Sequence, residues 1–126
     1  MQMIGSRVVR VAAIVGFLCA AVVLSAHTKL VKSEPAAGAA LAAAPKQVQL
    51  WFNEKIDPAV SKIELTSAAG KVALGPAHVI GEKSLIAPIT GKVDAGSYSI
   101  AWQTAGDDGH VIKGEVGFAV KSASTR

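Results

Sequence analysis

The chain has 126 residues, a length that fits one domain, and carries a formal net charge of +4. Two of its 13 basic residues, Arg7 and Arg10, lie near the N-terminus, and the chain without them has 11 basic against 9 acidic residues. The remaining lysines are scattered and do not cluster with aromatic residues, which argues against a nucleic-acid-binding surface.

Residues 1–26 predict a cleaved secretory signal peptide. A basic start is followed by an apolar run from Val11 to Leu24 and then by the small residues Ser25 and Ala26. The run has 14 residues, whereas a membrane-spanning helix needs roughly 20, so a cleaved leader is favoured over an uncleaved anchor. Cleavage after Ala26 makes His27 the first residue of the mature chain, whereas cleavage after Ser25 leaves Ala26 in front of it.

Residues 27–126 contain neither cysteine nor methionine, because Cys19, Met1 and Met3 all precede them. No disulfide can therefore hold the mature chain together, even in an oxidising compartment. A hydrophobic core must stabilise these 100 residues, which is feasible at this length.

The first half of the mature chain alternates between short extended runs and turn residues. The clearest run is 47–53, where Val48, Leu50 and Phe52 share one face. The alanine-rich stretch 36–45 lies between two prolines and predicts a loop with one helical turn, pinned to the core by Leu41. The other strands predicted here cover residues 27–33, ended by Glu34-Pro35, and residues 61–67 and 71–74, which form a hairpin.

The second half has the strongest alternation, at 97–104. Tyr98, Ile100 and Trp102 share one face there, and Tyr98 follows a turn in the manner of a corner tyrosine that hydrogen-bonds to the backbone. Further strands are predicted at 77–80, 84–89 and 110–120, before a polar tail at 122–126. About seven to nine short antiparallel strands predict one all-β domain over residues 27–121, either a sandwich or a barrel.

The sequence Asp107-Asp108-Gly109-His110 is the strongest candidate for chemistry. Asp108 and His110 are two residues apart, so in an extended or tightly turned segment their side chains point the same way and can converge on one ion. Gly109 permits a backbone bend that other residues resist. The same sequence also suits an ordinary hairpin turn. Asp107 is a less suitable ligand, because it lies three residues from His110.

His27 strengthens the metal hypothesis. As the first residue of the mature chain it offers its α-amine and its imidazole as a chelating pair, and with Asp108 and His110 it forms a nitrogen-rich set suited to tetragonal Cu(II) or, less well, Ni(II). Zinc would accept the same ligands in a tetrahedral arrangement. The mature chain has no sulfur ligand for Cu(I). His78 lies near Gly75-Pro76 with no nearby Asp, Cys or second His, which indicates an ordinary solvated or capping histidine.

The chain resembles the CopC family of periplasmic copper-binding, copper-resistance proteins over nearly all of residues 27–120. The resemblance rests on the ordered set His27-Thr28-Lys29-Leu30, 33–39 (SEPAAGA), 45–54 (PKQVQLWFNE), 96–102 (GSYSIAW), Asp108-Gly109-His110, Gly114 and 118–120 (FAV). Each piece alone is weak, but their order behind a signal peptide is specific. Gly106 stands where a serine is common in the family.

The resemblance implies a cupredoxin-like or Ig-like Greek-key β-barrel or sandwich. It also implies that His27, Asp108 and His110 are Cu(II) ligands and that Glu54 accepts a hydrogen bond from a ligand imidazole. Glu54 is otherwise an ordinary solvated loop acid. The implied function is a soluble, monomeric periplasmic copper carrier or buffer that exchanges copper with an inner-membrane CopD-like transporter or another periplasmic protein. The methionine-rich Cu(I) loop of some relatives is absent from residues 27–126.

Two other functions remain open on the sequence alone. A chelating N-terminal histidine with a second histidine also forms the site of copper-dependent lytic polysaccharide monooxygenases. Against this enzyme, Asp108 would fill a position that oxygen or substrate needs, and the few aromatic residues offer no flat sugar-binding platform. The other alternative is an adhesion or interaction module in which Asp108 and His110 only form a turn.

Overall fold

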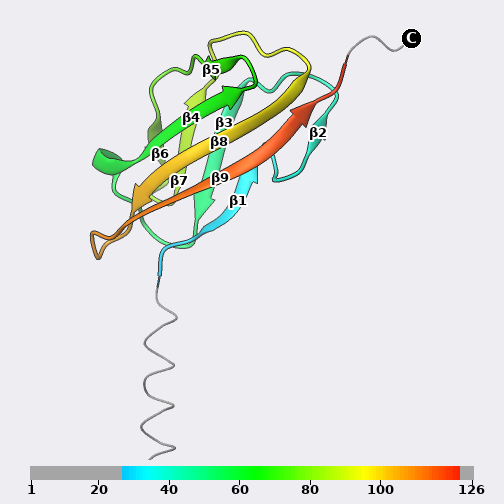
Figure 1. Cartoon of the computed structure of the whole chain (residues 1–126). Coiled ribbons are helices and arrows are strands. Elements are labelled where there is room, and N and C mark those ends of the chain that lie inside the picture. The colour runs from blue at the N-terminus through cyan, green and yellow to red at the C-terminus, as the bar shows by residue number, and fades with distance from the viewer. Residues whose placement is uncertain (1–26, 123–126) are drawn as a thin grey trace, which may run out of the picture.

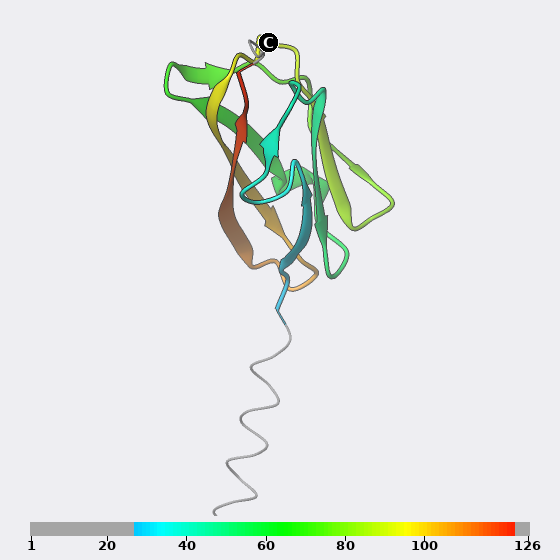
Figure 2. The same cartoon turned by 90° about the vertical axis from the view of Figure 1, so that its right-hand side faces the viewer.

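Two β-sheets lie face to face in the computed structural model, which describes residues 27–122 (Figures 1 and 2). The sheets have the strand orders β1-β3-β7-β6 and β2-β9-β8-β4-β5. The predicted signal peptide and residues 123–126 of the predicted tail lie outside the described residues. The elements are β1 (Leu30–Glu34), β2 (Ala40–Leu41), β3 (Gln47–Phe52), the 3-10 helix η1 (Pro58–Val60), β4 (Lys62–Ser67), β5 (Gly70–Val72), β6 (His78–Ile80), β7 (Ser84–Pro88), β8 (Gly96–Ala105) and β9 (Val111–Val120).

The prediction of an all-β fold is confirmed, and of its two forms the sandwich is the right one. No ladder joins the edge strands of one sheet to those of the other within residues 27–122, so the strands do not close into a barrel. Three of the four edge strands, β2, β5 and β6, have only two or three residues each. Such short strands provide too few backbone hydrogen bonds to extend a sheet around a closed barrel.

The helical turn predicted within residues 36–45 was wrong. This segment contains β2, which runs parallel to β9 and pairs Ala40 with Ala119. The segment is too short to nucleate a helix, so its backbone groups pair with the edge of the sheet instead. Thus the Ala119 amide donates to the Ala39 carbonyl at 2.8 Å. The one helical turn among the described residues is η1, capped by the Asp57 side chain.

The alternating side chains predicted for the two clearest strands do form the core. Val48, Leu50 and Ile100 have no exposed surface, and Phe52 is 3% exposed. Burying side chains of this size contributes about 1.5–3 kcal/mol each relative to leaving them exposed. The remaining large core residues come from both sheets: Leu65, Leu85, Tyr98, Val116, Phe118 and Val120.

The aromatic residues of β8 pack against both sheets. Tyr98 stacks on Phe118 with ring centroids 5.3 Å apart, and its hydroxyl donates to the Asp94 carbonyl at 2.6 Å. This bond confirms the predicted corner tyrosine. The rings of Trp102 and Phe52 form a T-shaped pair with centroids 5.2 Å apart, and Trp102 is partly buried against the core. Trp51 is half-buried on the outer face of its sheet, where the Lys32 ammonium lies 4.7 Å from its ring.

Strand pairing brings three distant segments to one end of the sandwich. The long hairpin β8–β9 ends with Ala105 opposite Val111, which leaves residues 106–110 as its loop. In the other sheet, Leu30 at the start of β1 pairs with Phe52 at the end of β3. The Asp57 amide donates to the Ala105 carbonyl at 2.9 Å and ties the segment after β3 to the hairpin. Residues 27–29, 53–57 and 106–110 therefore gather at the lower end in Figure 1.

Candidate metal centre

The loop 106–110 holds Asp108 and His110 on the same side, as their spacing predicts. Gly109 has a φ of +76°, a left-handed conformation that suits glycine, and its amide donates to the Gly106 carbonyl at 3.0 Å. The His110 amide donates to Oδ1 of Asp108 at 2.9 Å. The turn therefore fixes the aspartate relative to the histidine backbone.

The two side chains face each other without a strong contact. Nδ1 of His110 lies 3.9 Å from Oδ2 of Asp108, and the side chains are 81% and 54% exposed. This separation is too long for a hydrogen bond. Oδ1 of Asp108 bonds to the backbone, whereas Oδ2 faces the imidazole and solvent. A small rotation of two exposed side chains would place both atoms on one ion.

Gly106 is the point where the N-terminal segment, Glu54 and the hairpin loop meet. It is buried, although the four loop residues after it are exposed. A methyl group at Gly106 would overlap the Thr28 hydroxyl and lie 3.3 Å from Oε1 of Glu54. The absence of a side chain therefore lets residue 28 and the Glu54 carboxylate approach the loop.

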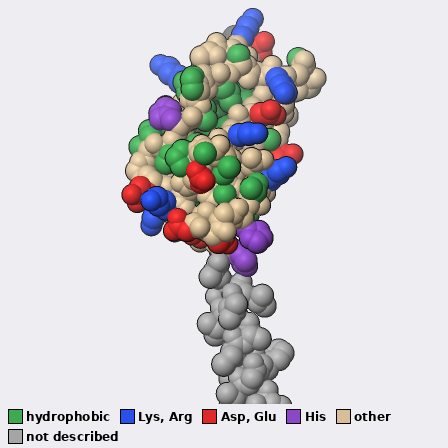
Figure 3. Space-filling model, turned by 90° about the vertical axis from the view of Figure 1, so that its left-hand side faces the viewer, with side chains coloured by type: hydrophobic (Ala, Val, Ile, Leu, Met, Phe, Trp, Pro, Cys, Tyr) green, Lys and Arg blue, Asp and Glu red, His purple; other side chains and the backbone are tan. Residues whose placement is uncertain are grey.

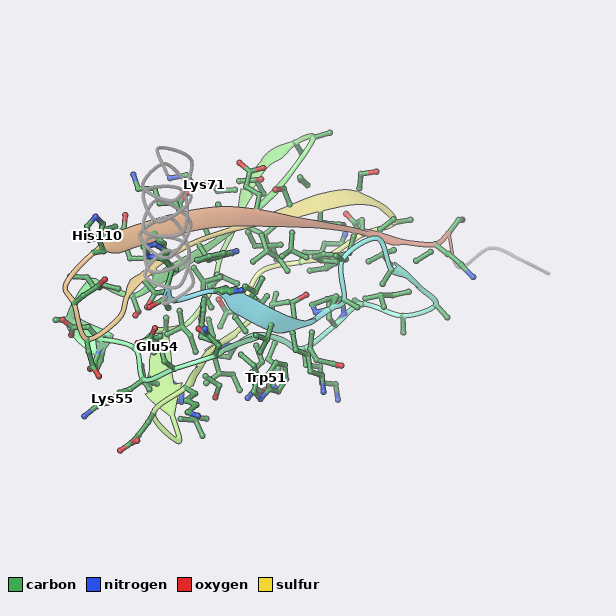
Figure 4. All side chains as sticks on the ribbon, turned by 90° about the horizontal axis from the view of Figure 1, so that it is seen from below. Trp51, Glu54, Lys55, Lys71 and His110 are labelled. Atoms are coloured by element: carbon green, nitrogen blue, oxygen red, sulfur yellow. The ribbon has the colours of Figure 1, made fainter. Side chains whose placement is uncertain are left out.

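The N-terminal segment is fixed by Asn53, just after β3. Nδ2 of Asn53 donates to the His27 carbonyl at 3.0 Å, and Oδ1 accepts from the Lys29 amide at 2.8 Å. The Asn53 amide donates to the Lys29 carbonyl at 3.0 Å. Figure 3 shows two histidine side chains next to each other at this end of the domain, and Figure 4 looks at the domain from below, with His110 and Glu54 labelled.

The structure does not gather the predicted ligands into one cluster. Within residues 27–122, no three His, Cys, Asp or Glu side chains lie close enough together to hold a metal ion. Asp108 and His110 face each other, and Glu54 approaches Gly106, but the predicted ligands do not surround one point. In the 126-residue chain the nitrogen of His27 is a peptide nitrogen bonded to Ala26, so the α-amine of the predicted ligand set is not free in this chain.

His78 lies apart from these residues, on the edge strand β6. It is exposed, and Nδ1 lies 3.4 Å from the Pro76 carbonyl. Its register partner in the sheet is the apolar Ile86. The structure therefore places no second ligating side chain opposite it in the ladder, in line with the prediction of an ordinary surface histidine.

Comparison with known proteins decides the family. The CopC domain model matches residues 30–121. This chain belongs to the CopC family. The match covers Glu54, Asp108 and His110, whereas His27 lies three residues before it.

Curated relatives and solved structures agree with the CopC match. Copper resistance protein C from Xanthomonas campestris pv. juglandis is 36% identical over 104 residues, which span 76% of this chain and 81% of that protein. Protein YobA from Escherichia coli K12 is 31% identical over 99 residues, spanning 76% and 80%. The crystal structure of CopC from Methylosinus trichosporium OB3b superposes with a TM-score of 0.70 at 29% identity, covering 79% of this chain and 99% of that one.

PcoC from Escherichia coli, described as a methionine-rich copper resistance protein, gives a TM-score of 0.69 at 32% identity. The match covers 76% of this chain and all of PcoC. Both methionines of this chain, Met1 and Met3, precede the described residues and the CopC match. Those described residues also include no helix long and apolar enough to span a membrane.

Sequence reasoning missed two residues of this CopC domain's candidate centre. The sequence analysis gives neither residue a role at the site: Asn53 ends a predicted strand, Thr28 belongs to the first one, and both lie in stretches that carry the family resemblance. The sequence does contain one signal for Asn53, because it directly precedes Glu54. Its bonds to residues 27 and 29 depend on tertiary structure and are not encoded in any local pattern.

Proposed function

We propose that the mature CopC domain, beginning at His27, is a periplasmic copper-binding protein that binds one Cu(II). The ligands are the His27 amine and imidazole, the His110 imidazole and the Asp108 carboxylate. The observation that carries the proposal is the meeting of residue 28, Glu54 and the Asp108–His110 loop around Gly106. Removal of residues 1–26 would create the amine at this end of the domain.

The donor set determines which metal and oxidation state the site favours. Nitrogen ligands with one carboxylate oxygen suit the tetragonal geometry of Cu(II). Residues 27–126 contain no cysteine or methionine, the soft ligands that Cu(I) prefers. The relative PcoC is described as methionine-rich. We therefore propose a single Cu(II) site without a second, methionine-rich Cu(I) site.

Glu54 supports the site without binding the metal. A ligand histidine usually donates its other ring N–H to a carboxylate or carbonyl, which fixes the ring and increases its basicity. Glu54 is half-buried and its carboxylate approaches Gly106, next to the N-terminal segment and the loop that carries His110. It is therefore placed to accept such a bond once the ligands close around copper.

The function we propose is transport or buffering rather than catalysis. Copper binds at an exposed end of the domain, where His110 and Asp108 are open to solvent, and can pass directly to another protein. The signal peptide would deliver the protein to the periplasm as a soluble monomer. Its partner would be a CopD-like inner-membrane copper transporter or another periplasmic copper protein.

The site is tested by Cu(II) titration of the protein that begins at His27, followed by EPR. We expect one equivalent to bind with a tetragonal, nitrogen-rich spectrum. His110→Ala should weaken binding more than about 100-fold, because even loss of a supporting partner of a ligand typically costs roughly 10–100-fold.

His78→Ala is the matched control, since it removes an exposed histidine remote from the loop, and it should leave affinity and spectrum unchanged. Equal affinities for the two variants would contradict the proposed site.

A further inference from the structure

Asn53, an exposed residue just after β3, bonds to the N-terminal segment through both its side chain and its backbone. Its side-chain amide bonds to two backbone groups, the His27 carbonyl at 3.0 Å and the Lys29 amide at 2.8 Å. Its own amide bonds to the Lys29 carbonyl at 3.0 Å. Three hydrogen bonds therefore hold His27 and Lys29, two of the three described residues that precede β1.

These bonds determine the orientation of the Asn53 side chain. A peptide N–H such as that of Lys29 can only donate, so the atom facing it must be the oxygen Oδ1. The His27 carbonyl can only accept, so the atom facing it must be the nitrogen Nδ2. A flipped amide would lose both bonds, and the side chain is thus locked in one direction.

The neighbouring residue Glu54 makes this lock relevant to the site. Asn53 fixes the backbone of His27, and the Glu54 carboxylate approaches Gly106 at the base of the loop with Asp108 and His110. Asn53 and Glu54, which are adjacent in sequence, therefore contact the two parts of the candidate centre, the N-terminal segment and the 106–110 loop. We propose that Asn53 is a positioning residue, which holds the mature N-terminus so that the His27 chelate is aimed at the 106–110 loop. This inference rests on the proposed function.

The expected effect follows from the cost of ordering the chain. His27 would be the free end of the mature protein, and it is exposed. Without the side-chain bonds, copper binding itself would have to order at least one more backbone residue. We expect this cost to weaken Cu(II) binding about tenfold, which corresponds to about 1.4 kcal/mol.

The test compares Asn53→Ala with Gln103→Ala in the protein that begins at His27. Gln103 is the matched control because its side-chain amide also donates to a backbone carbonyl, that of Val60, at 3.1 Å. We expect Asn53→Ala to bind Cu(II) about tenfold more weakly with an altered EPR spectrum, while Gln103→Ala keeps the native affinity and spectrum. In the copper-free protein, Asn53→Ala should also increase the exchange rate of the Lys29 amide proton.

The possible failures can be told apart. If His110→Ala binds copper as the native protein does, the proposed function fails and this inference fails with it. If His110 is needed but Asn53→Ala matches the native protein in affinity and spectrum, only the inference is overturned. Equal weakening by Asn53→Ala and Gln103→Ala would show a general loss of stability and would also overturn it.

Discussion

The two ends of the β8–β9 hairpin differ in how they use their polar groups. At the end near Gly96, the Tyr98 hydroxyl donates to the Asp94 carbonyl, and the ring stacks on Phe118. At the other end, His110 and Asp108 are 81% and 54% exposed and face each other at 3.9 Å without a hydrogen bond between their side chains. Both ends belong to the same pair of ten-residue strands.

Because of this difference, we expect the stability of the fold and the binding of copper to depend on different parts of the hairpin. Tyr98 satisfies its polar group internally and contributes to the folded state. The ring nitrogen of His110 and one oxygen of Asp108 remain available to a ligand, because the turn uses only the other oxygen of Asp108 and the His110 backbone amide. Substitutions at the core and at the Tyr98 end should therefore change stability alone, whereas those at the loop end should change copper affinity alone.

The largest effect on stability is expected from Ile100→Ala in the middle of the hairpin. Ile100 has no exposed surface and pairs with Leu65 and Val116. Its truncation should lower the free energy of unfolding by about 2–5 kcal/mol, because it removes buried area and leaves a cavity. Urea unfolding measures this loss. The copper affinity of the folded fraction should stay native. A loss of affinity together with the loss of stability would contradict the expectation that core substitutions change stability alone.

Glu54→Gln should produce a smaller change, in the free energy of copper binding, at the loop end of the hairpin. We expect Cu(II) affinity to fall by roughly 10–100-fold with the stoichiometry still at one, because the carboxylate that orients a ligand imidazole is replaced by a neutral amide. A competition titration against a chelator of known affinity measures the change. Glu64→Gln is the control, since Glu64 is an exposed carboxylate on β4 paired with Lys71. If Glu54→Gln bound Cu(II) with native affinity, Glu54 would be an ordinary solvated loop acid and would not support the site.

Tyr98→Phe should have the smallest effect. It removes the hydrogen bond to the Asp94 carbonyl and keeps the stacked ring. Loss of one such bond lowers stability by about 0.5–1.5 kcal/mol. Thermal or urea unfolding should show this shift while copper binding stays unchanged. An altered EPR spectrum in Tyr98→Phe would mean that the two ends of the hairpin are coupled.

Most of the fold could be predicted from alternation in the sequence. The strands at 47–53 and 97–104 lie where Val48, Leu50, Ile100 and Tyr98 predict them, because a half-buried strand requires one apolar face. The short strand β2 could not be predicted in this way. It has two residues and is held by backbone bonds to β9, which leave no pattern in the side chains.

The candidate site could be predicted only in part. Asp108 and His110 lie in one turn, so their spacing was sufficient to predict that they face each other. The contacts of Asn53 with residues 27 and 29 span more than 20 positions and arise from the pairing of β1 with β3. Whether His27 joins the pair depends on the removal of residues 1–26, a covalent step that strand patterns do not encode.

The most direct test of the copper site uses the position of the first residue. One protein begins at His27, and a second carries a single extra alanine in front of it; both are titrated with Cu(II) and examined by EPR. The extra residue converts the His27 amine into a peptide nitrogen and leaves every side chain in place. We predict that the first protein binds one equivalent with a tetragonal, nitrogen-rich spectrum and that the second binds more weakly with a changed spectrum. Identical affinity and spectrum in the two proteins would contradict a site built on the N-terminal histidine.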